Sequence, residues 1–297
     1  MSEVFVHSVA LMGTVVTFQI VGFSSENTAL VTRAVEWFRH VEQACNRFDP
    51  TSELCRLSQR VGEAAPVSNT LLQSVWFALA VAEETDGAFD PTVGHRMAAR
   101  GFDKDYRTGE RADVAVEASA DATYRDVTVD VENRTITLHR PLLLDLGAVA
   151  KGLAIDMAAK ELAPLENFAI DAGGDLYFAG HNRNDEPWTA GIRHPRNEGA
   201  VIETLRISNS ALCTSGDYER RTDAGHHIID PRTGDASIAV ASATVQAPFA
   251  MVADGLATAA FVLGPERGVA LLEKHGVRGM ILTPALDRYD TFLMIGD

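Results

Sequence analysis

Apolar and polar side chains alternate in some stretches of this chain and recur at helical spacing in others. Residues 14–22, TVVTFQIVG, alternate like a half-buried strand. Residues 24–45 carry apolar side chains every three or four positions, which predicts a helix. A second helix is predicted within residues 69–87, where Gly87 is suited to cap the C-terminal end.

The second half of the chain continues this mixture without a regular strand–helix–strand rhythm. Residues 123–130 and 134–140 read as two strands, and the polar VENR between them predicts a hairpin turn. Residues 144–162 predict a glycine-containing turn that leads into a helix, and residues 168–180 predict a strand, a tight turn and a strand. We therefore expect an α+β fold rather than a doubly wound sheet, in a single domain over residues 1–297.

The charge and composition of the chain exclude some classes of function. The 297 residues include 26 Lys and Arg against 41 Asp and Glu, which gives a formal net charge of −15. A nucleic-acid binder needs a basic face that displaces counterions, so we expect no nucleic-acid partner. The sequence shows no stretch apolar enough to span a bilayer, no signal peptide, and no cysteine pattern that suits a metal or a disulfide framework. We expect a cytoplasmic protein.

Short motifs rich in glycine, aspartate, threonine and histidine carry the candidate chemistry. The chain lacks the P-loop, the GxGxxG dinucleotide motif, HExxH and the GxSxG nucleophile elbow. It contains instead short stretches at residues 11–14, 87–94, 145–152, 171–175, 214–221, 226–234 and 253–259. Each alone is typical of a turn, but together they indicate a functional site.

The stretch ADGLATAAF, residues 253–261, places Asp254 four residues before Thr258. In a helix this spacing stacks the two side chains on one face, where their oxygens can meet. The alternative is structural: Thr258 bonds back to the carbonyl of Asp254, and Asp254 faces water.

The ordered set of motifs resembles the ApbE-type FAD:protein FMN transferases, which attach FMN covalently to a Thr or Ser of another flavoprotein. The resemblance runs from Met12 to about Gly264. It implies two related halves of T-fold-like character in one compact domain, one FAD per protomer, and a magnesium ion near the pyrophosphate. The implied metal ligands are Asp254, Thr258 and the backbone carbonyl of Ala148, and oxygen ligands are those that Mg²⁺ prefers.

The resemblance also implies which residues contact FAD. They are Met12, Phe48, Ala88, Phe89, Asp90, Asp145, Lys151 and Ile229. We expect Lys151 to neutralise phosphate charge and the AFD stretch to meet the adenine or ribose. Phe48 stands where the family often has a flavin-stacking Tyr, and where some members have Asn and hydrolyse FAD. Met12, Ile229 and Lys151 also suit ordinary packing or a solvated helix end.

An acceptor hydroxyl needs a base before it can attack the pyrophosphate. His227 is the best candidate because a histidine titrates near neutrality and Asp230 follows closely enough to orient it. A buried structural histidine is the competing interpretation, and Asp217 is a weaker candidate base. The neighbouring His226 is expected to matter less, because adjacent side chains of a strand point to opposite faces.

Three functions of different class therefore stay open. The first is Mg²⁺-dependent FMN transfer from FAD to an acceptor flavoprotein with release of AMP. The second is a metal-dependent FAD pyrophosphatase, and the third is a non-catalytic FAD-binding module. A serine hydrolase using Ser215 and His227 lacks its elbow motif.

Overall fold

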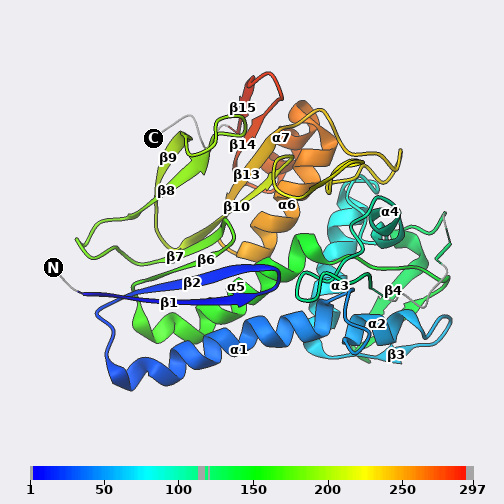
Figure 1. The fold of residues 1–297 in the computed structure, drawn as a ribbon, viewed down its shortest axis with the longest axis horizontal. Helices are drawn as coiled ribbons and strands as arrows, with labels where there is room; N and C mark the ends of the chain where they lie inside the picture. The colour runs from blue at the N-terminus through cyan, green and yellow to red at the C-terminus, as the bar shows by residue number, and fades with distance from the viewer. Residues whose placement is uncertain (1–2, 113–117, 120, 292–297) are drawn as a thin grey trace. The chain divides into compact units, whose positions relative to one another are not determined.

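The structure is a computed structural model that describes residues 3–112, 118–119 and 121–291 (Figure 1). It combines helices with antiparallel sheets, which confirms the α+β class. Its contacts divide the chain into two units, each made of separate segments. The first unit comprises Met1–Arg39, Lys151–Gly216 and Ala239–Asp297, and the second comprises His40–Ala150 and Asp217–Ile238.

The first unit is built on an eight-stranded sheet in the order β1-β2-β6-β7-β10-β13-β14-β15, in which all neighbours are antiparallel. The strands are β1 (Val4–Leu11), β2 (Thr14–Val21), β6 (Phe168–Ala172), β7 (Asp175–Ala179), β10 (Ser210–Gly216), β13 (Ser242–Ala247), β14 (Arg278–Leu282) and β15 (Arg288–Asp290). The strand at residues 14–22 and the strand–turn–strand at residues 168–180 are confirmed. Met12 and Gly13 turn β1 into β2 with φ of 52° and 76°.

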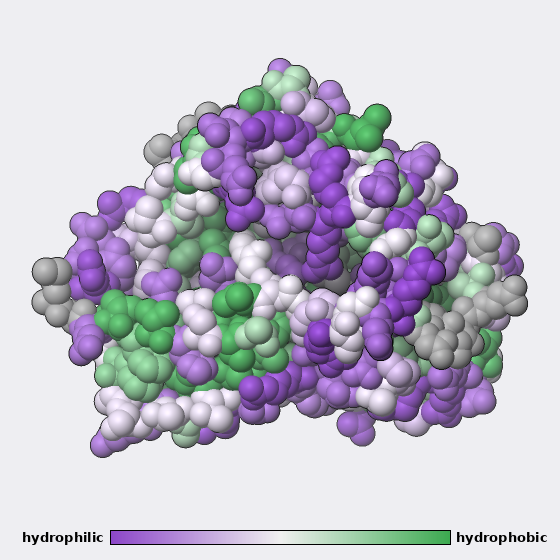
Figure 2. Space-filling model, in the orientation of Figure 1, coloured by the Kyte–Doolittle hydropathy of each residue, from purple (hydrophilic) through white to green (hydrophobic). Residues whose placement is uncertain are grey.

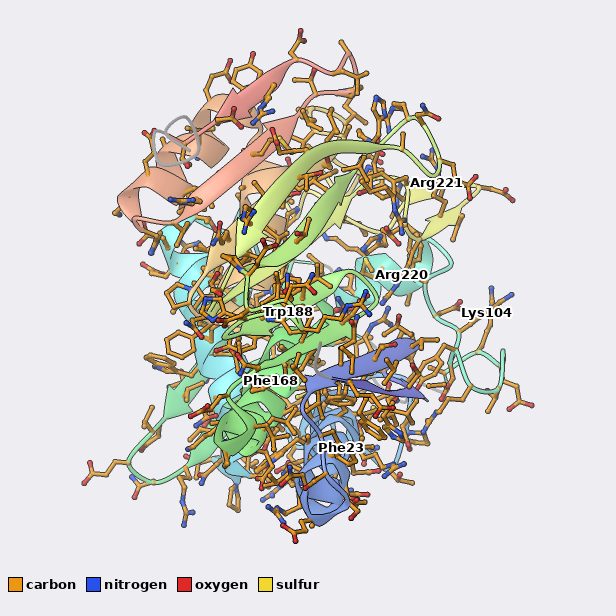
Figure 3. All side chains as sticks on the ribbon, turned by 90° about the vertical axis from the view of Figure 1, so that its left-hand side faces the viewer. Phe23, Lys104, Phe168, Trp188, Arg220 and Arg221 are labelled. Carbon is orange, nitrogen blue, oxygen red and sulfur yellow. The ribbon has the colours of Figure 1, made fainter. Side chains whose placement is uncertain are left out.

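Helices and a small hairpin cover this sheet. Helix α6 (Ala250–Leu263) packs on β10 and β13, and α7 (Pro265–Lys274) packs on α6 and β14 (Figure 1). The hairpin of β8 (Trp188–Arg193) and β9 (Val201–Ile207) shares one apolar cluster with residues of β6, β7, β10 and β14. Trp188, labelled in Figure 3, packs 6.0 Å from the Phe178 ring and donates to the Ala179 carbonyl.

Two long helices, α1 (Thr28–Cys45) and α5 (Gly147–Leu162), run through the points where the chain passes from one unit to the other. In the first unit, Phe38 of α1 meets Phe18 of β2 edge-on at 5.9 Å, and both rings are fully buried. Other side chains of β1 and β2 are less protected. Figure 2 shows apolar surface over the β1–β2 hairpin, where Val6 and Val15 are both more than half exposed.

The second unit contains one 16-residue helix, shorter helices and a three-stranded sheet in the order β3-β5-β4. Its elements are α2 (Glu53–Ser58), β3 (Ala65–Pro66), α3 (Asn69–Glu84), α4 (Gly94–Ala99), β4 (Val127–Asp130), β5 (Thr135–Leu138), β11 (Arg221–Thr222) and β12 (Gly225–His226). Among the described residues of both units, short 3₁₀ turns occur at Ser25–Asn27, Tyr124–Asp126 and Ala163–Leu165.

The predicted hairpin and helix of the second unit are confirmed, but the first strand begins at Val127 rather than at residue 123, because Tyr124–Asp126 form a 3₁₀ turn. The β4–β5 hairpin turns at VENR, as expected. Helix α3 ends at Glu84, three residues before Gly87, because Asp86 already adopts a positive φ of 48°. The Gly87 N–H then closes the end by donating to the Ala82 carbonyl at 2.8 Å. No helix within the described residues combines the length and hydropathy that crossing a membrane requires.

Candidate functional site

Asp254 and Thr258 lie one turn apart on α6, so the helical spacing expected from the sequence is present. Asp254 is only 6% exposed. The Thr258 hydroxyl lies 2.9 Å from the Ser215 hydroxyl of β10, which holds this side chain against the sheet. Removing a carboxylate from water is unfavourable unless positive charge or several donors compensate it, and a cation meets that requirement.

The chemistry of this pair suits Mg²⁺. Both side chains offer oxygen, and Mg²⁺ typically takes one or two carboxylates and completes its shell with water and substrate phosphates. Across the part of the chain that the structure describes, no three His, Cys, Asp or Glu side chains gather to hold a metal by themselves. Ala148, the third expected ligand, lies in the first turn of α5, in the second unit. Metal binding stays a prediction.

Lys151 of α5, expected to neutralise phosphate charge, has a carboxylate partner. Its Nζ donates to Asp175 of β7, which is almost fully buried. The Lys151 charge is therefore compensated within the first unit, and a phosphate would share or displace this partner. Its contact with FAD stays a prediction.

Arg47, which sequence reasoning did not identify, connects two of the expected FAD residues of the second unit. Its guanidinium lies 4.1 Å over the Phe48 ring and its Nε donates to the Asp145 carboxylate at 2.5 Å. Its Nη2 donates to the Phe102 carbonyl at 2.5 Å. Arg47 is 4% exposed, and its Nη1 has no hydrogen-bond partner among the described residues. One face of the Phe48 ring is thus covered by Arg47, and the side chain as a whole is partly exposed.

Asp145 is ionised and fixed by these contacts. Its Oδ1 accepts the Gly147 N–H at 2.8 Å, at the start of α5. Burial alone would raise the pKa of Asp145, but the charge of Arg47 and the Gly147 N–H outweigh burial and hold the pKa below its usual value. The carboxylate therefore positions Arg47 and the first turn of α5 in this structure.

His227 lies beside the same cluster. Its ring meets the Phe102 ring at 6.3 Å, and its Nδ1 is buried with no hydrogen-bond partner within the described residues. Burial first, and then the positive charge of Arg220 (labelled in Figure 3), lower the pKa of His227 to about 4. The expectation that this histidine titrates near neutrality is therefore wrong, because burial was not visible in the sequence.

The contacts of Asp230 and His226 differ from those of His227. The Asp230 carboxylate accepts from Arg232 at 2.8 Å and 2.7 Å rather than from His227, so the orienting contact is not made in this structure. His226 is 6% exposed; its Nε2 donates to the Ser237 carbonyl at 2.8 Å and its Nδ1 accepts the Ile228 N–H. Both ring nitrogens of His226 thus make structural hydrogen bonds. Of these two histidines, His227 has the ring nitrogen, Nδ1, that can accept a proton without breaking a hydrogen bond among the described residues.

The AFD stretch lies in the interior of the second unit. Ala88, Phe89 and Asp90 are all buried. Asp90 accepts the N–H and hydroxyl of Thr92 at 2.8 Å and 2.7 Å, and the Tyr124 N–H at 3.0 Å. Burial outweighs these donors and raises its pKa. Asp90 also lines a cavity of about 180 Å³, so it can border a ligand while its oxygens hold the loop.

The remaining residues expected to contact FAD are the apolar Ile229 and Met12. Ile229 is 5% exposed and bridges to Ala236, which fits the packing role that its residue type suggested. Met12 is half-buried at the β1–β2 turn, where its φ is 52°. Contact of these two residues with FAD stays a prediction.

Comparison with known proteins identifies the family. A model of the ApbE family matches residues 12–281. The chain is 30% identical over 270 residues to the FAD:protein FMN transferase of Haemophilus influenzae, covering 86% of this chain and 78% of that protein. It is 30% identical over 282 residues to the FAD:protein FMN transferase of Vibrio cholerae, covering 90% and 83%.

The fold agrees with a solved structure. The crystal structure of the ApbE protein from Thermotoga maritima matches with a TM-score of 0.87 at 28% identity, covering 99% of this chain and 98% of that chain. This confirms the ApbE-like α+β fold, while the T-fold-like relation of two halves and the single domain stay predictions. Because the family match spans most of its length and the relatives are 30% identical, the chain belongs to the ApbE family.

Proposed function

We propose that this protein transfers the FMN moiety of FAD to a Thr or Ser hydroxyl of an acceptor flavoprotein, releases AMP, and requires Mg²⁺. The observation that carries the proposal is the buried carboxylate and the hydroxyl one turn apart on α6, in a chain whose relatives are named FAD:protein FMN transferases. Asp254, Thr258 and the Ala148 carbonyl would hold the ion. When bound, Mg²⁺ neutralises charge that develops on the pyrophosphate oxygens.

The residues around Arg47 support the binding of an aromatic anion. Phe48 is a partly exposed aromatic ring that can stack on a ligand, and Arg47 already lies over one of its faces. The unpartnered Nη1 of Arg47 and the charge of Arg220 add positive potential beside Asp145. In a protein of net charge −15, this local excess of arginine favours a phosphate-bearing ligand.

His227 is the candidate base. With a pKa of about 4 it is neutral throughout the physiological range, and its Nδ1 carries no competing hydrogen bond within the described residues. A neutral imidazole can accept the proton of the attacking hydroxyl, and a bound pyrophosphate would stabilise the imidazolium that forms.

The test is a reaction with purified components. The protein, FAD and Mg²⁺ are incubated with and without an FMN-acceptor domain, and AMP, free FMN and covalent flavin are measured. We expect one AMP per flavin attached to the acceptor, and no transfer after chelation of the metal. Absence of both AMP and covalent flavin would refute the proposal and leave a binding module.

FAD hydrolysis is the second candidate, and Phe48 is the residue that bears on it. Phe48 lacks the hydroxyl of the Tyr that often occupies this position in the family. Release of AMP and free FMN at the same rate with and without the acceptor would identify a pyrophosphatase.

A further inference from the structure

The start of α6 is held by a residue of another helix. Phe249, at the N-cap position, makes no side-chain cap. Asp156 of α5 takes this role: its Oδ1 accepts the Ala250 N–H at 2.7 Å and its Oδ2 accepts the Met251 N–H at 3.0 Å. The first N–H groups of a helix lack partners within the helix, and a carboxylate there also interacts favourably with the helix dipole.

Gly152, one turn before Asp156 on α5, allows this contact. A Cβ at position 152 would lie 2.4 Å from the Met251 Cα and 2.6 Å from the Ala250 carbonyl carbon. Only a glycine lets the two helices approach so closely. Gly152 and Asp156 therefore form one docking face of α5 for the first turn of α6.

Further contacts fix α6 along its length. The Cys213 Sγ lies 3.6 Å from the Ala250 carbonyl oxygen, and the Ser215 hydroxyl lies 2.9 Å from that of Thr258. Asp254 follows Ala250 by one turn, about 6 Å along the axis at the usual rise of an α-helix. A shift or rotation of the first turn is therefore passed directly to Asp254.

Asp156 also acts through its charge. Burial raises the pKa of Asp156 to about 6, against the opposing effect of its two N–H donors, and the negative charge of Asp254 raises it further. The two carboxylates therefore interact electrostatically. Together they make the electrostatic potential at Asp254 more negative than one carboxylate would.

We propose that Asp156 is a positioning residue for the metal pair. By clamping the first turn of α6 it fixes the Asp254 carboxylate and the Thr258 hydroxyl, and so sets the affinity of this pair for a divalent cation. This inference rests on the proposed function, since it takes Asp254 and Thr258 to be metal ligands.

The experiment measures cation binding directly, without turnover. Mn²⁺ is used as the probe, and free Mn²⁺ is followed by electron paramagnetic resonance, with Mg²⁺ as competitor. We expect Asp156→Ala to weaken Mn²⁺ binding by roughly 10-fold or more, the scale found when a group that orients a metal ligand is removed. Asp156→Asn keeps one acceptor oxygen and should restore part of the affinity.

Two comparisons isolate the role of Asp156. Ser68 caps α3 in the second unit by accepting the Leu71 N–H at 3.2 Å, so Ser68→Ala removes a helix cap away from α6. It should lower the melting temperature but leave Mn²⁺ affinity unchanged. If Asp156→Ala does not fold, as judged by circular dichroism, the isosteric Asp156→Asn decides the question.

The outcomes separate this inference from the proposed function. Loss of Mn²⁺ binding in Asp254→Asn with native affinity in both Asp156 variants would overturn the positioning role alone. Native affinity in Asp254→Asn would overturn the metal assignment, and the inference with it. Equal weakening by Ser68→Ala and Asp156→Ala would show that general destabilisation, not positioning, lowers the affinity.

Discussion

The low pKa of His227 leads to a pH profile that an ordinary histidine would not give. A pKa of about 4 leaves the ring about 90% neutral at pH 5 and more than about 99% neutral at pH 7. The share of neutral base, and with it the contribution of His227 to the rate, therefore rises by only about 10% between these two pH values. At a pKa of 6.5 the neutral share would rise by about 25-fold.

The assay compares kcat/KM for covalent flavinylation in the native protein and in His227→Ala, from pH 5 to pH 8. The pH dependence of kcat/KM reports the titrating groups of the free enzyme. Groups that the native protein and His227→Ala share cancel in the ratio of their kcat/KM values. We expect His227→Ala to be slower by roughly 100-fold or more, and the ratio to stay nearly constant with pH. The ring itself is followed by NMR, with His227→Ala to assign the signal.

Two results would contradict this reasoning. A His227 ring that titrates near pH 6.5 would show that burial and Arg220 do not suppress its protonation. A near-native rate for His227→Ala would remove His227 from the reaction and move the base to Asp217, Asp230 or His226.

Three further substitutions test the candidate site. Asp254→Asn removes the only charged metal ligand assigned, so turnover should be lost and Mg²⁺ binding should weaken. Circular dichroism should show an intact fold, and full activity would end the metal assignment. Phe48→Ala should weaken FAD binding by about 1 to 3 kcal/mol in fluorescence titrations, the scale for losing an aromatic platform, and unchanged affinity would make Phe48 a packing residue. Gly152→Ala should lower the free energy of unfolding by about 1 to 3 kcal/mol or more, measured with urea, because its Cβ would lie 2.4 Å from the Met251 Cα; a native stability would disprove the close approach.

Local patterns were sufficient for much of the fold. The β4–β5 hairpin and α3 follow from period, turn residues and caps within a few positions of each element. Gly87 lies three residues beyond the end of α3, because the chain leaves the helix at Thr85 and already adopts a positive φ at Asp86.

The connections within the site could not be found in this way. Arg47 binds Asp145, 98 residues away, and Phe102, 55 residues away, and nothing in the letters NRF distinguishes a buried arginine from a solvated one. The cap that Asp156 provides for α6 crosses 94 residues. The pKa of His227 depends on burial and on Arg220, neither of which its own motif encodes.

The division of the chain into alternating segments governs the order in which the protein can fold during synthesis. When the ribosome has made the first 216 residues, the second unit still lacks Asp217–Ile238 and the first unit lacks its last segment. Strand β10 then has β7 on one side and an open edge on the other, until β13 emerges to pair with it. Such an edge is a template for pairing with other chains. The nascent protein therefore exposes this edge of β10 until β13 emerges, and a chaperone bound in that interval would protect it from pairing with other chains.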